Sequence, residues 1–243
     1  MPRTFGLIDG NSFYCSCERA FQPRLQRLLV VVLSNNDGCA ISRTAEAKPL
    51  GVKMGDPWHL VRSKRELTGV EWLSSNYALY GDMSRCIFHV LAERVPRAEP
   101  YSIDEMFLDL DAMGDLTALC RSLRADVLRI TKIPTCTGWG PSKTIAELAN
   151  GLAKNNPSMN GVCDLASAET RAAHYAALPP GEVWGISWPL AVRHQSPTLP
   201  QAEATSFQLR HSRRRGIKRQ PCFCRLDMRF RVHGQGNLQR LQE

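Results

Sequence analysis

Two spacings of apolar residues alternate along the first 165 positions, and this alternation constrains the fold more than any other feature. Short apolar runs of strand length are separated by longer segments in which apolar residues recur every three or four positions, as on one face of a helix. The clearest helix pattern runs from Leu116 to Ile130. The expected strands are 4–9, 28–34, 70–73, two within 98–110, and 134–138, and the expected helices are 12–21, 57–66, 77–94, 116–130 and 142–153.

The order of these elements predicts the fold class. With the segment 30–73 set aside, the elements follow the order β-α-β-β-α-β. This order is typical of an α+β protein with a ferredoxin-like (split βαβ) sheet. We therefore predict such a sheet with a small subdomain inserted at about residues 30 to 73.

Charge is distributed unevenly along the chain. Residues 187–243 hold 11 of the 31 lysines and arginines but 3 of the 23 acids, which leaves 20 of each for residues 1–186. The net charge of +8 therefore says nothing about what residues 1–186 bind. Residues 187–243 show no sustained periodicity, and Leu, Ile, Val and Phe make up 12 of their 57 positions, so we expect an irregular or disordered segment. Non-specific binding of phosphates is an alternative role for it.

Composition indicates a soluble globular protein. The hydrophobic content is 43% and the charged content 22%, and the longest apolar run, Leu28–Leu33, is too short to span a bilayer. The N-terminus lacks the apolar core of a signal peptide, so we expect a cytoplasmic protein without a membrane partner. The nine cysteines include two Cys-x-Cys pairs, whereas zinc sites usually use Cys-x-x-Cys pairs. We expect reduced, mostly buried thiols, with a metal role as the less favoured alternative.

Three acids stand where the predicted strands end or begin. Asp9 closes the first strand, and Asp104 and Glu105 lie between the two strands within 98–110. In a split βαβ sheet these two places lie on neighbouring central strands. Three carboxylates meeting there would form an oxygen-rich site suited to Mg²⁺. The alternative is that Asp104 and Glu105 belong to an ordinary solvated turn.

Ten short motifs in register favour the metal site. Together they resemble the UmuC branch of the Y-family translesion DNA polymerases, over residues 1 to about 186. The motifs are Asp9-Gly-Asn-Ser-Phe-Tyr14, Ser34-Asn-Asn-Asp-Gly-Cys39, Ala45-Glu-Ala-Lys48, Gly51-Val-Lys-Met-Gly-Asp-Pro-Trp58, Ser75-Asn-Tyr77, Tyr101-Ser-Ile-Asp-Glu105, Lys143-Thr144, Leu148-Ala-Asn150, Ala153-Lys154 and Val183-Trp-Gly-Ile186.

The resemblance implies a catalytic role for the acids. Asp9, Asp104 and Glu105 match the family's metal-binding carboxylates, with the carbonyl of Gly10 as a further ligand. The implied cofactors are two Mg²⁺ ions that bind together with a deoxynucleoside triphosphate. The implied activity is error-prone translesion synthesis in the SOS response, by nucleotidyl transfer onto a primer 3′-hydroxyl.

The resemblance also implies nucleotide and DNA contacts. Tyr14 matches the steric gate that excludes a ribose 2′-hydroxyl, and Phe13 would pack under the incoming nucleotide. Lys48 and Lys154 match cations that reach the triphosphate, and lysine serves there as a mobile point charge. Arg43 is a weaker candidate for the triphosphate, and Lys143 for a DNA phosphate. Without the motifs, the aromatic pair would be interpreted as core packing and the lysines as surface residues.

The implied domains are a palm (1–29 and 74–165), fingers (30–73) and the start of a thumb (166–186). After Ile186 nothing resembles the family's thumb or little finger, so residues 187–243 form a non-family, Arg-rich tail. We hypothesise a frameshift near codon 187, which the coding DNA would reveal. The implied partners are primer-template DNA, UmuD-like subunits, RecA and the sliding clamp, although many of the protein contacts belong to the region without resemblance.

Three positions depart from the family pattern. Trp139 stands where the family has a small or aliphatic residue and must find room in or beside the sheet. Pro49 is expected to end its helical turn early. Glu147 replaces a common lysine and removes a possible phosphate contact.

Two other interpretations stay open. The chain is alternatively a catalytically inactive, truncated remnant that keeps the fold and at most binds DNA or partners. A nucleotidyl cyclase would share the palm, but it would need neither Tyr14 as a sugar gate nor a fingers insertion.

Overall fold

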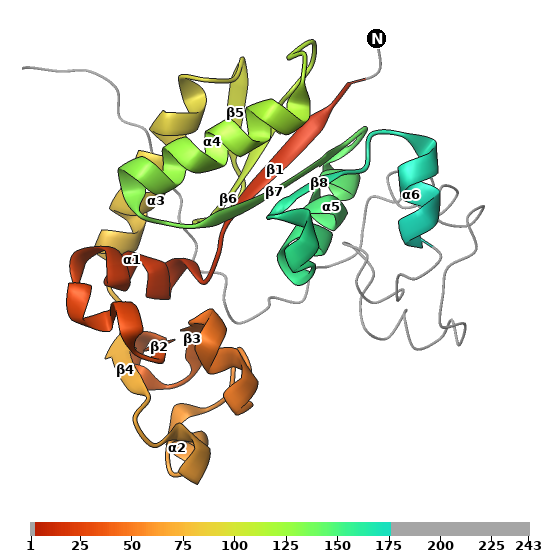
Figure 1. Cartoon of the computed structure of the whole chain (residues 1–243). Coiled ribbons are helices and arrows are strands. Elements are labelled where there is room, and N and C mark those ends of the chain that lie inside the picture. Colours follow the sequence, from red (N-terminus) through yellow and green to blue (C-terminus); the bar gives the residue numbers. More distant parts are fainter. Residues whose placement is uncertain (1–2, 176–243) are drawn as a thin grey trace, which may run out of the picture. The chain divides into compact units, whose positions relative to one another are not determined.

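The computed structural model describes residues 3 to 175 (Figure 1). The predicted tail, residues 187–243, lies outside these residues, and so does the part of the predicted thumb after residue 175.

A five-stranded sheet forms the centre of the fold, in the order β5-β6-β1-β7-β8. The central strand β1 pairs antiparallel with both β6 and β7, and β8 adds to β7 in parallel. Taken in chain order with their helices, the first four strands follow β-α-β-β-α-β, which confirms the predicted α+β split βαβ fold. The strands are β1 (Phe5–Gly10), β5 (Arg97–Pro100), β6 (Glu105–Asp109), β7 (Thr135–Gly140) and β8 (Val162–Asp164).

The long helices begin at residues whose side chains satisfy free backbone N–H groups. Asn76 accepts from the Leu79 N–H at 3.1 Å, Asp115 from the Ala118 N–H at 3.0 Å, and Ser142 from the Ile145 N–H at 3.3 Å. These three residues precede α3, α4 and α5, each close to its predicted range. The helices are α1 (Phe13–Phe21), α3 (Tyr77–Ala92), α4 (Leu116–Thr131), α5 (Lys143–Asn155) and α6 (Ala168–Tyr175).

The helices cover opposite faces of the sheet (Figure 1). On one face, Ile8 and Met106 pack in a core cluster with residues of α1, α3 and α4. On the other face, Leu7 and Phe107 pack against Ala146 of α5. Because successive strand residues point to opposite faces, every second residue of β1 and β6 faces α5.

The same alternation explains how β7 accommodates Trp139. Trp139 is 1% exposed and belongs to the cluster with α3 and α4, whereas Gly138 lies under α5. A Cβ on Gly138 would come within 2.2 Å of the Asn150 nitrogen, so glycine is required for this close approach of helix and strand. The bulky Trp139 side chain therefore lies on one face of the sheet, whereas α5 packs directly against the β7 backbone on the other face.

A smaller sheet lies in the inserted segment, in the order β3-β2-β4. Its strands are β2 (Val30–Leu33), β3 (Ala40–Arg43) and β4 (Glu71–Ser74). Val31 and Leu33 pack with Trp58 and Val61 in a separate cluster, whereas Val30 and Val32 join the main core. Alternate residues of β2 therefore anchor the insertion to the rest of the fold.

Two local predictions in the insertion are wrong. The helix expected at 57–66 is one short turn, α2 (Trp58–Val61), followed by a 3₁₀ turn, η4 (Arg65–Leu67). After Val61 the next buried apolar residue is Leu67, which leaves no continuous apolar stripe to hold a longer helix. Pro49 does not end its turn early, because η3 (Ala45–Leu50) is a 3₁₀ helix that continues past it. The other 3₁₀ turns are η1 (Pro23–Arg27), η2 (Asn35–Asp37) and η5 (Pro157–Met159).

The seven cysteines in the described residues are free thiols, and five of them are buried. Burial raises the pKa of Cys15 to about 11 and that of Cys120 to about 12. Neither thiol is therefore ionised to any extent at neutral pH. Within residues 3–175, no helix combines the length and the apolar character required to cross a bilayer.

Candidate active site

Asp9 and Glu105 are direct partners in the pairing of β1 with β6. Both belong to the alternating set of residues that face α5, together with Leu7 and Phe107. Asp104 directly precedes β6, and its carbonyl accepts a hydrogen bond of 2.9 Å from the Gly10 N–H. The sheet register thus brings the three predicted acids and Gly10 together from positions almost 100 residues apart.

The hydroxyl of Ser102 connects two of these acids. Its Oγ lies 2.8 Å from Asp104 Oδ1 and 3.0 Å from Glu105 Oε2, and it accepts a hydrogen bond of 3.2 Å from the Glu105 N–H. A hydroxyl has one proton, so it can donate to one carboxylate at a time. Ser102 therefore holds the two carboxylates close together without compensating both charges.

Asp9 is the buried acid of the group, with 4% of its surface exposed. Its Oδ2 is paired with the Lys154 ammonium, whereas its Oδ1 is buried and has no hydrogen-bond partner among the described residues. Burial, with smaller contributions from the Asp104 and Glu105 charges, raises the pKa of Asp9 to about 7 although Lys154 opposes this. A buried carboxylate oxygen without a partner is costly unless a ligand or a cation satisfies it.

The donor set suits a hard divalent cation. Asp9, Asp104, Glu105 and the carbonyl of Gly10 offer only oxygen atoms, which Mg²⁺ prefers. Asp9 Oδ1 is buried and lacks a hydrogen-bond partner among the described residues. In the described part of the chain, no three His, Cys, Asp or Glu side chains yet converge closely enough to hold an ion. The residues therefore fit Mg²⁺ in the type of donor that they offer, and a bound ion would have to draw their carboxylates together.

Tyr14 lies in a cluster of aromatic rings at the start of α1. Its ring centroid is 4.7 Å from that of Tyr80, 6.1 Å from that of Tyr77 and 5.8 Å from that of Phe13. Tyr14 is half-buried, so part of its ring is accessible, whereas Phe13 is 2% exposed. The structure thus supports a packing role for Phe13, whose ring meets that of Tyr14 edge-on, and a contact of Phe13 with a nucleotide stays a prediction.

The lysine and arginine side chains that were predicted to bind phosphates lie in different surroundings. Lys154 joins the acid cluster directly. Lys143 lies 2.7 Å from Glu99 and 4.7 Å from the centroid of the Phe107 ring. Lys48 is exposed on η3 and forms no ion pair with any described residue. In Arg43, Nε and Nη1 are buried and lack described partners, which leaves a guanidinium that can accept an anion.

Two residues that position this site, Ser102 and Asn150, had no role predicted from the sequence. Ser102 appeared within a motif without a function of its own. Asn150 is 2% exposed, and its amide donates to the carbonyls of Leu7 at 3.2 Å and Cys136 at 2.9 Å. It thereby ties α5, and with it Lys154, to β1 and β7. A polar residue among the apolar positions of α5 was the available signal.

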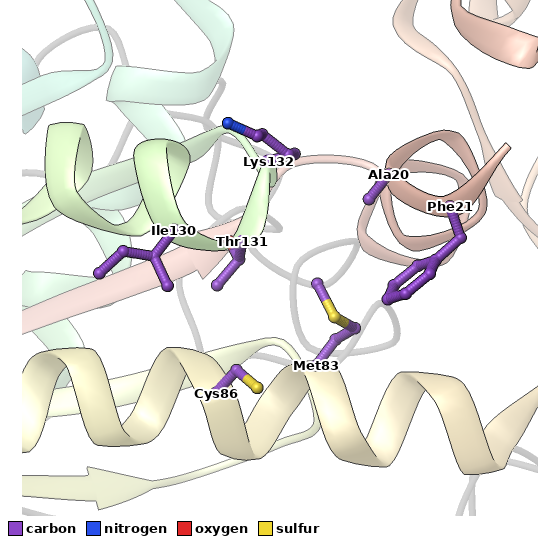
Figure 2. Close-up of a pocket in the computed structure, with 7 residues that line it drawn as sticks. All are labelled: Ala20, Phe21, Met83, Cys86, Ile130, Thr131 and Lys132. Carbon is purple, nitrogen blue, oxygen red and sulfur yellow. The ribbon is translucent and has the colours of Figure 1, made fainter. Parts of the chain in front are cut away.

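A pocket of about 300 Å³ lies away from the acids, between the ends of α1 and α4 and the middle of α3 (Figure 2). None of the predicted site residues lines it. The lining residues are Ala20, Phe21, Met83, Cys86, Ile130, Thr131 and Lys132.

This fold is that of the palm and fingers of Y-family DNA polymerases. A structure titled as a ternary complex of Dbh has a TM-score of 0.68 and 25% sequence identity, and the match covers 78% of this chain and 55% of that chain. A chimera of Dbh with the same TM-score is titled a Y-family DNA polymerase.

The sequence comparisons give the family. The model of the impB/mucB/samB family matches residues 8–151. Protein UmuC of Salmonella typhimurium (strain LT2) is 45% identical over 186 residues, which are 75% of this chain and 44% of that protein. DNA polymerase IV of Moorella thermoacetica is 32% identical over 208 residues, which are 82% of this chain and 47% of that protein. The chain belongs to the impB/mucB/samB family, as its motifs predicted, and it spans less than half the length of these relatives.

Proposed function

We propose that residues 1–186 are the catalytic head of an error-prone translesion DNA polymerase. In this proposal the palm comprises residues 1–29 and 74–165, the fingers 30–73, and the start of the thumb 166–186. The observation that carries the proposal is the pairing of Asp9 with Glu105 beside Asp104, with one buried oxygen of Asp9 that lacks a hydrogen-bond partner among the described residues. A cluster of three carboxylates, one of them buried, with a single paired lysine is suited to binding metal ions.

In the proposed reaction, Asp9, Asp104, Glu105 and the Gly10 carbonyl hold two Mg²⁺ ions. When bound, the ions supply activation of a primer 3′-hydroxyl and stabilisation of the leaving pyrophosphate. Lys154 then exchanges the Asp9 carboxylate for the triphosphate, because its ammonium is a mobile point charge. Arg43 and Lys48 contribute further positive charge from the fingers.

In this proposal Tyr14 selects the sugar of the incoming nucleotide. Its half-buried ring, held by Tyr77, Tyr80 and Phe13, would lie against the deoxyribose and collide with a 2′-hydroxyl. A rigid aromatic surface suits this role because rejection by collision requires that the ring cannot move aside. Lys143 is proposed to contact a DNA phosphate after it leaves Glu99.

The small fingers subdomain is the basis for proposing low fidelity. This subdomain has a sheet of three short strands and one short α-helix. A small lid excludes less water and tests the shape of the base pair less strictly than a large closing domain, so damaged templates are tolerated. A role in the SOS response, cytoplasmic location and the partners UmuD-like subunits, RecA and sliding clamp stay predictions from the family resemblance.

Primer extension by the purified 243-residue chain with Mg²⁺ tests the proposal, on undamaged and abasic templates. Asp104→Ala serves as the matched inactive variant, because it removes one carboxylate at a half-exposed position without opening the core. Extension by the wild-type chain that Asp104→Ala abolishes would support the proposal. Folded wild-type protein that extends no primer would reject it and favour an inactive remnant.

A further inference from the structure

Tyr101 presents an exposed aromatic ring beside the acids of the candidate active site. It follows β5 directly, and its N–H donates a hydrogen bond of 2.9 Å to the Glu105 carbonyl. Asp104 belongs to the same turn between β5 and β6. Tyr101 is 46% exposed. The turn next to these two acids therefore offers an aromatic surface to solvent.

Phe107 holds the Tyr101 ring on the sheet face that carries the acids. The two ring centroids are 5.2 Å apart, and the rings meet edge to face at 62°, which is a favoured arrangement of aromatic rings. Phe107 follows Glu105 by two positions on β6, so both side chains point to the face covered by α5. The ring of Tyr101, which packs on Phe107, therefore lies on this face too.

A cation also packs on Phe107. The Lys143 ammonium, on the first residue of α5, lies 4.7 Å from the centroid of the Phe107 ring and 2.7 Å from Glu99 Oε1. The side chains of Lys143 and Glu99 are 36% and 46% exposed, and ion pairs between exposed groups contribute little to stability. A phosphate can therefore take the place of Glu99 at Lys143.

The two ends of α5 indicate which strand of DNA would meet these side chains. Lys154, which pairs with Asp9, lies eleven positions after Lys143, or about 16 Å along the helix axis. In an in-line displacement, the attacking oxygen and the leaving group lie on opposite sides of the reacting phosphorus. Because the proposed function assigns the triphosphate to Lys154, the primer strand would approach from the Lys143 end, where the two rings lie.

We infer that Tyr101 is a contact residue for the primer strand near its 3′ end. Its ring packs against a deoxyribose, while Lys143 leaves Glu99 and binds a phosphate of the same strand. The sugar-phosphate backbone is the part of the duplex that reaches the ring, because paired bases stack on one another. Cations and aromatic rings act together in this way on nucleic-acid strands. The inference rests on the proposed function, which sets the 3′-hydroxyl at the acids, and it makes Glu99 a competitor of the phosphate.

Binding of a fluorescein-labelled primer-template to the full 243-residue chain tests this role without any need for catalysis. Fluorescence anisotropy measures the affinity in the absence of metal and nucleotide. We expect Tyr101→Ala to weaken binding about 10-fold, whereas Tyr101→Phe keeps the ring and binds like wild type. Phe21→Ala is the matched control, because Phe21 is an exposed aromatic residue, 62% accessible, that lines the pocket away from the acids.

The salt dependence of binding separates the ring from the charge. Lys143→Ala should reduce the slope of log affinity against log salt concentration by about 1, because one phosphate contact is lost. Tyr101→Ala should lower the affinity and leave this slope unchanged, since the ring releases no counterion. Glu99→Gln should tighten binding by up to about 5-fold, because Lys143 loses its competitor. Circular dichroism of each variant shows whether it is folded.

Photo-crosslinking identifies the strand that Tyr101 contacts, with p-benzoylphenylalanine introduced in place of Tyr101. We expect crosslinks to the primer, within its last few nucleotides. Crosslinks to the template strand alone, or an affinity that Tyr101→Ala does not change, would reject the role of Tyr101.

The outcomes separate this inference from the proposed function. If Tyr101 is rejected while wild type extends primers and Asp104→Ala does not, the proposed function stands. Primer crosslinks at position 101 in a folded chain that extends no primer support the contact and reject the proposed activity. A wild-type chain that binds no primer-template rejects both.

Discussion

Lys154 in the last turn of α5 forms an ion pair with Asp9 at the end of β1, although 145 positions separate the two residues in sequence. The pair forms because α5 lies directly across β7 and β1, where Gly138 permits the close approach. The proposed active site therefore depends on how closely one helix rests on the sheet.

The contact between α5 and β7 should be sensitive to a single methyl group. In Gly138→Ala the new Cβ would lie 2.2 Å from the Asn150 nitrogen and 2.4 Å from the Ala149 carbonyl carbon, so α5 must move. We expect a loss of about 3 kcal/mol in the free energy of unfolding, measured by urea titration, together with weaker Mn²⁺ binding.

Gly151→Ala is the matched control on the same helix. Nothing lies within 4 Å of a Cβ at Gly151, so alanine should stabilise the chain by about 0.5 to 1 kcal/mol. Equal effects of the two substitutions would contradict the close-approach explanation.

Tyr80 should stabilise the junction of α1 and α3 through its hydroxyl group. The hydroxyl donates to the buried Glu18 carboxylate at 2.8 Å, and Gln22 donates to the other carboxylate oxygen at 2.9 Å. Tyr80→Phe should cost about 1 to 3 kcal/mol in urea unfolding, because one oxygen of a buried carboxylate loses its partner. In the Glu18→Gln background the same substitution should cost less, and an equal cost in both backgrounds would show that the hydrogen bond is not the cause.

Cation binding should weaken at acidic pH because Asp9 has a raised pKa. Its pKa of about 7 means that protons compete with a cation at Asp9 below that pH. We expect the apparent Mn²⁺ affinity to fall by up to about 10-fold per unit as pH decreases from 7 to 6. Mn²⁺ titrations at pH 8, 7 and 6 would measure this fall.

The same raised pKa of Asp9 has the opposite effect on the stability of the metal-free protein, which should be greater at acidic pH. Folded metal-free protein holds the Asp9 proton more tightly than unfolded protein does. Its stability should therefore decrease as pH rises from the ordinary carboxyl range toward 7. Asp9→Asn should lack this decrease, and urea unfolding of both proteins at pH 5 and pH 7 would show whether it does.

Tyr14 should determine the choice between deoxyribonucleotides and ribonucleotides. Replacing it with alanine removes the ring that would collide with a 2′-hydroxyl, so incorporation of ribonucleotides relative to deoxyribonucleotides should rise by at least about 10-fold. Tyr14→Phe keeps the ring and should keep the discrimination. Single-nucleotide primer extension with each nucleotide type measures the ratio, and an unchanged ratio in Tyr14→Ala would remove Tyr14 from this role.

Much of the fold follows from local patterns in the sequence. Helices are defined by features that lie within a few neighbouring residues. Examples are the apolar stripe of α4 and the capping residues Asn76, Asp115 and Ser142. Asp9 and Glu105 could be predicted to meet because strand order determines which strand ends are neighbours. The helix expected after Pro57 was too long because Trp58 and Val61 begin an apolar pattern that the following residues do not continue.

What the sequence could not predict depends on contacts between distant elements. Trp139 was expected to need room in or beside the sheet, but the sequence did not show where; alternation along β7 places it in the core with residues of α3 and α4. The bonds of Asn150 to two strands, and the unpartnered oxygen of Glu147, arise only when α5 is placed on the sheet. No local pattern encodes that placement.

In the proposed function, the carboxylates at the meeting point of β1 and β6 bind the metal ions of nucleotidyl transfer. Crystals of the chain grown with Mn²⁺ and a non-hydrolysable deoxynucleoside triphosphate would test it through the anomalous signal of manganese. We expect manganese peaks between Asp9, Asp104 and Glu105, with the Lys154 ammonium moved from Asp9 to the triphosphate. Manganese bound elsewhere, with Lys154 still paired to Asp9, would contradict it.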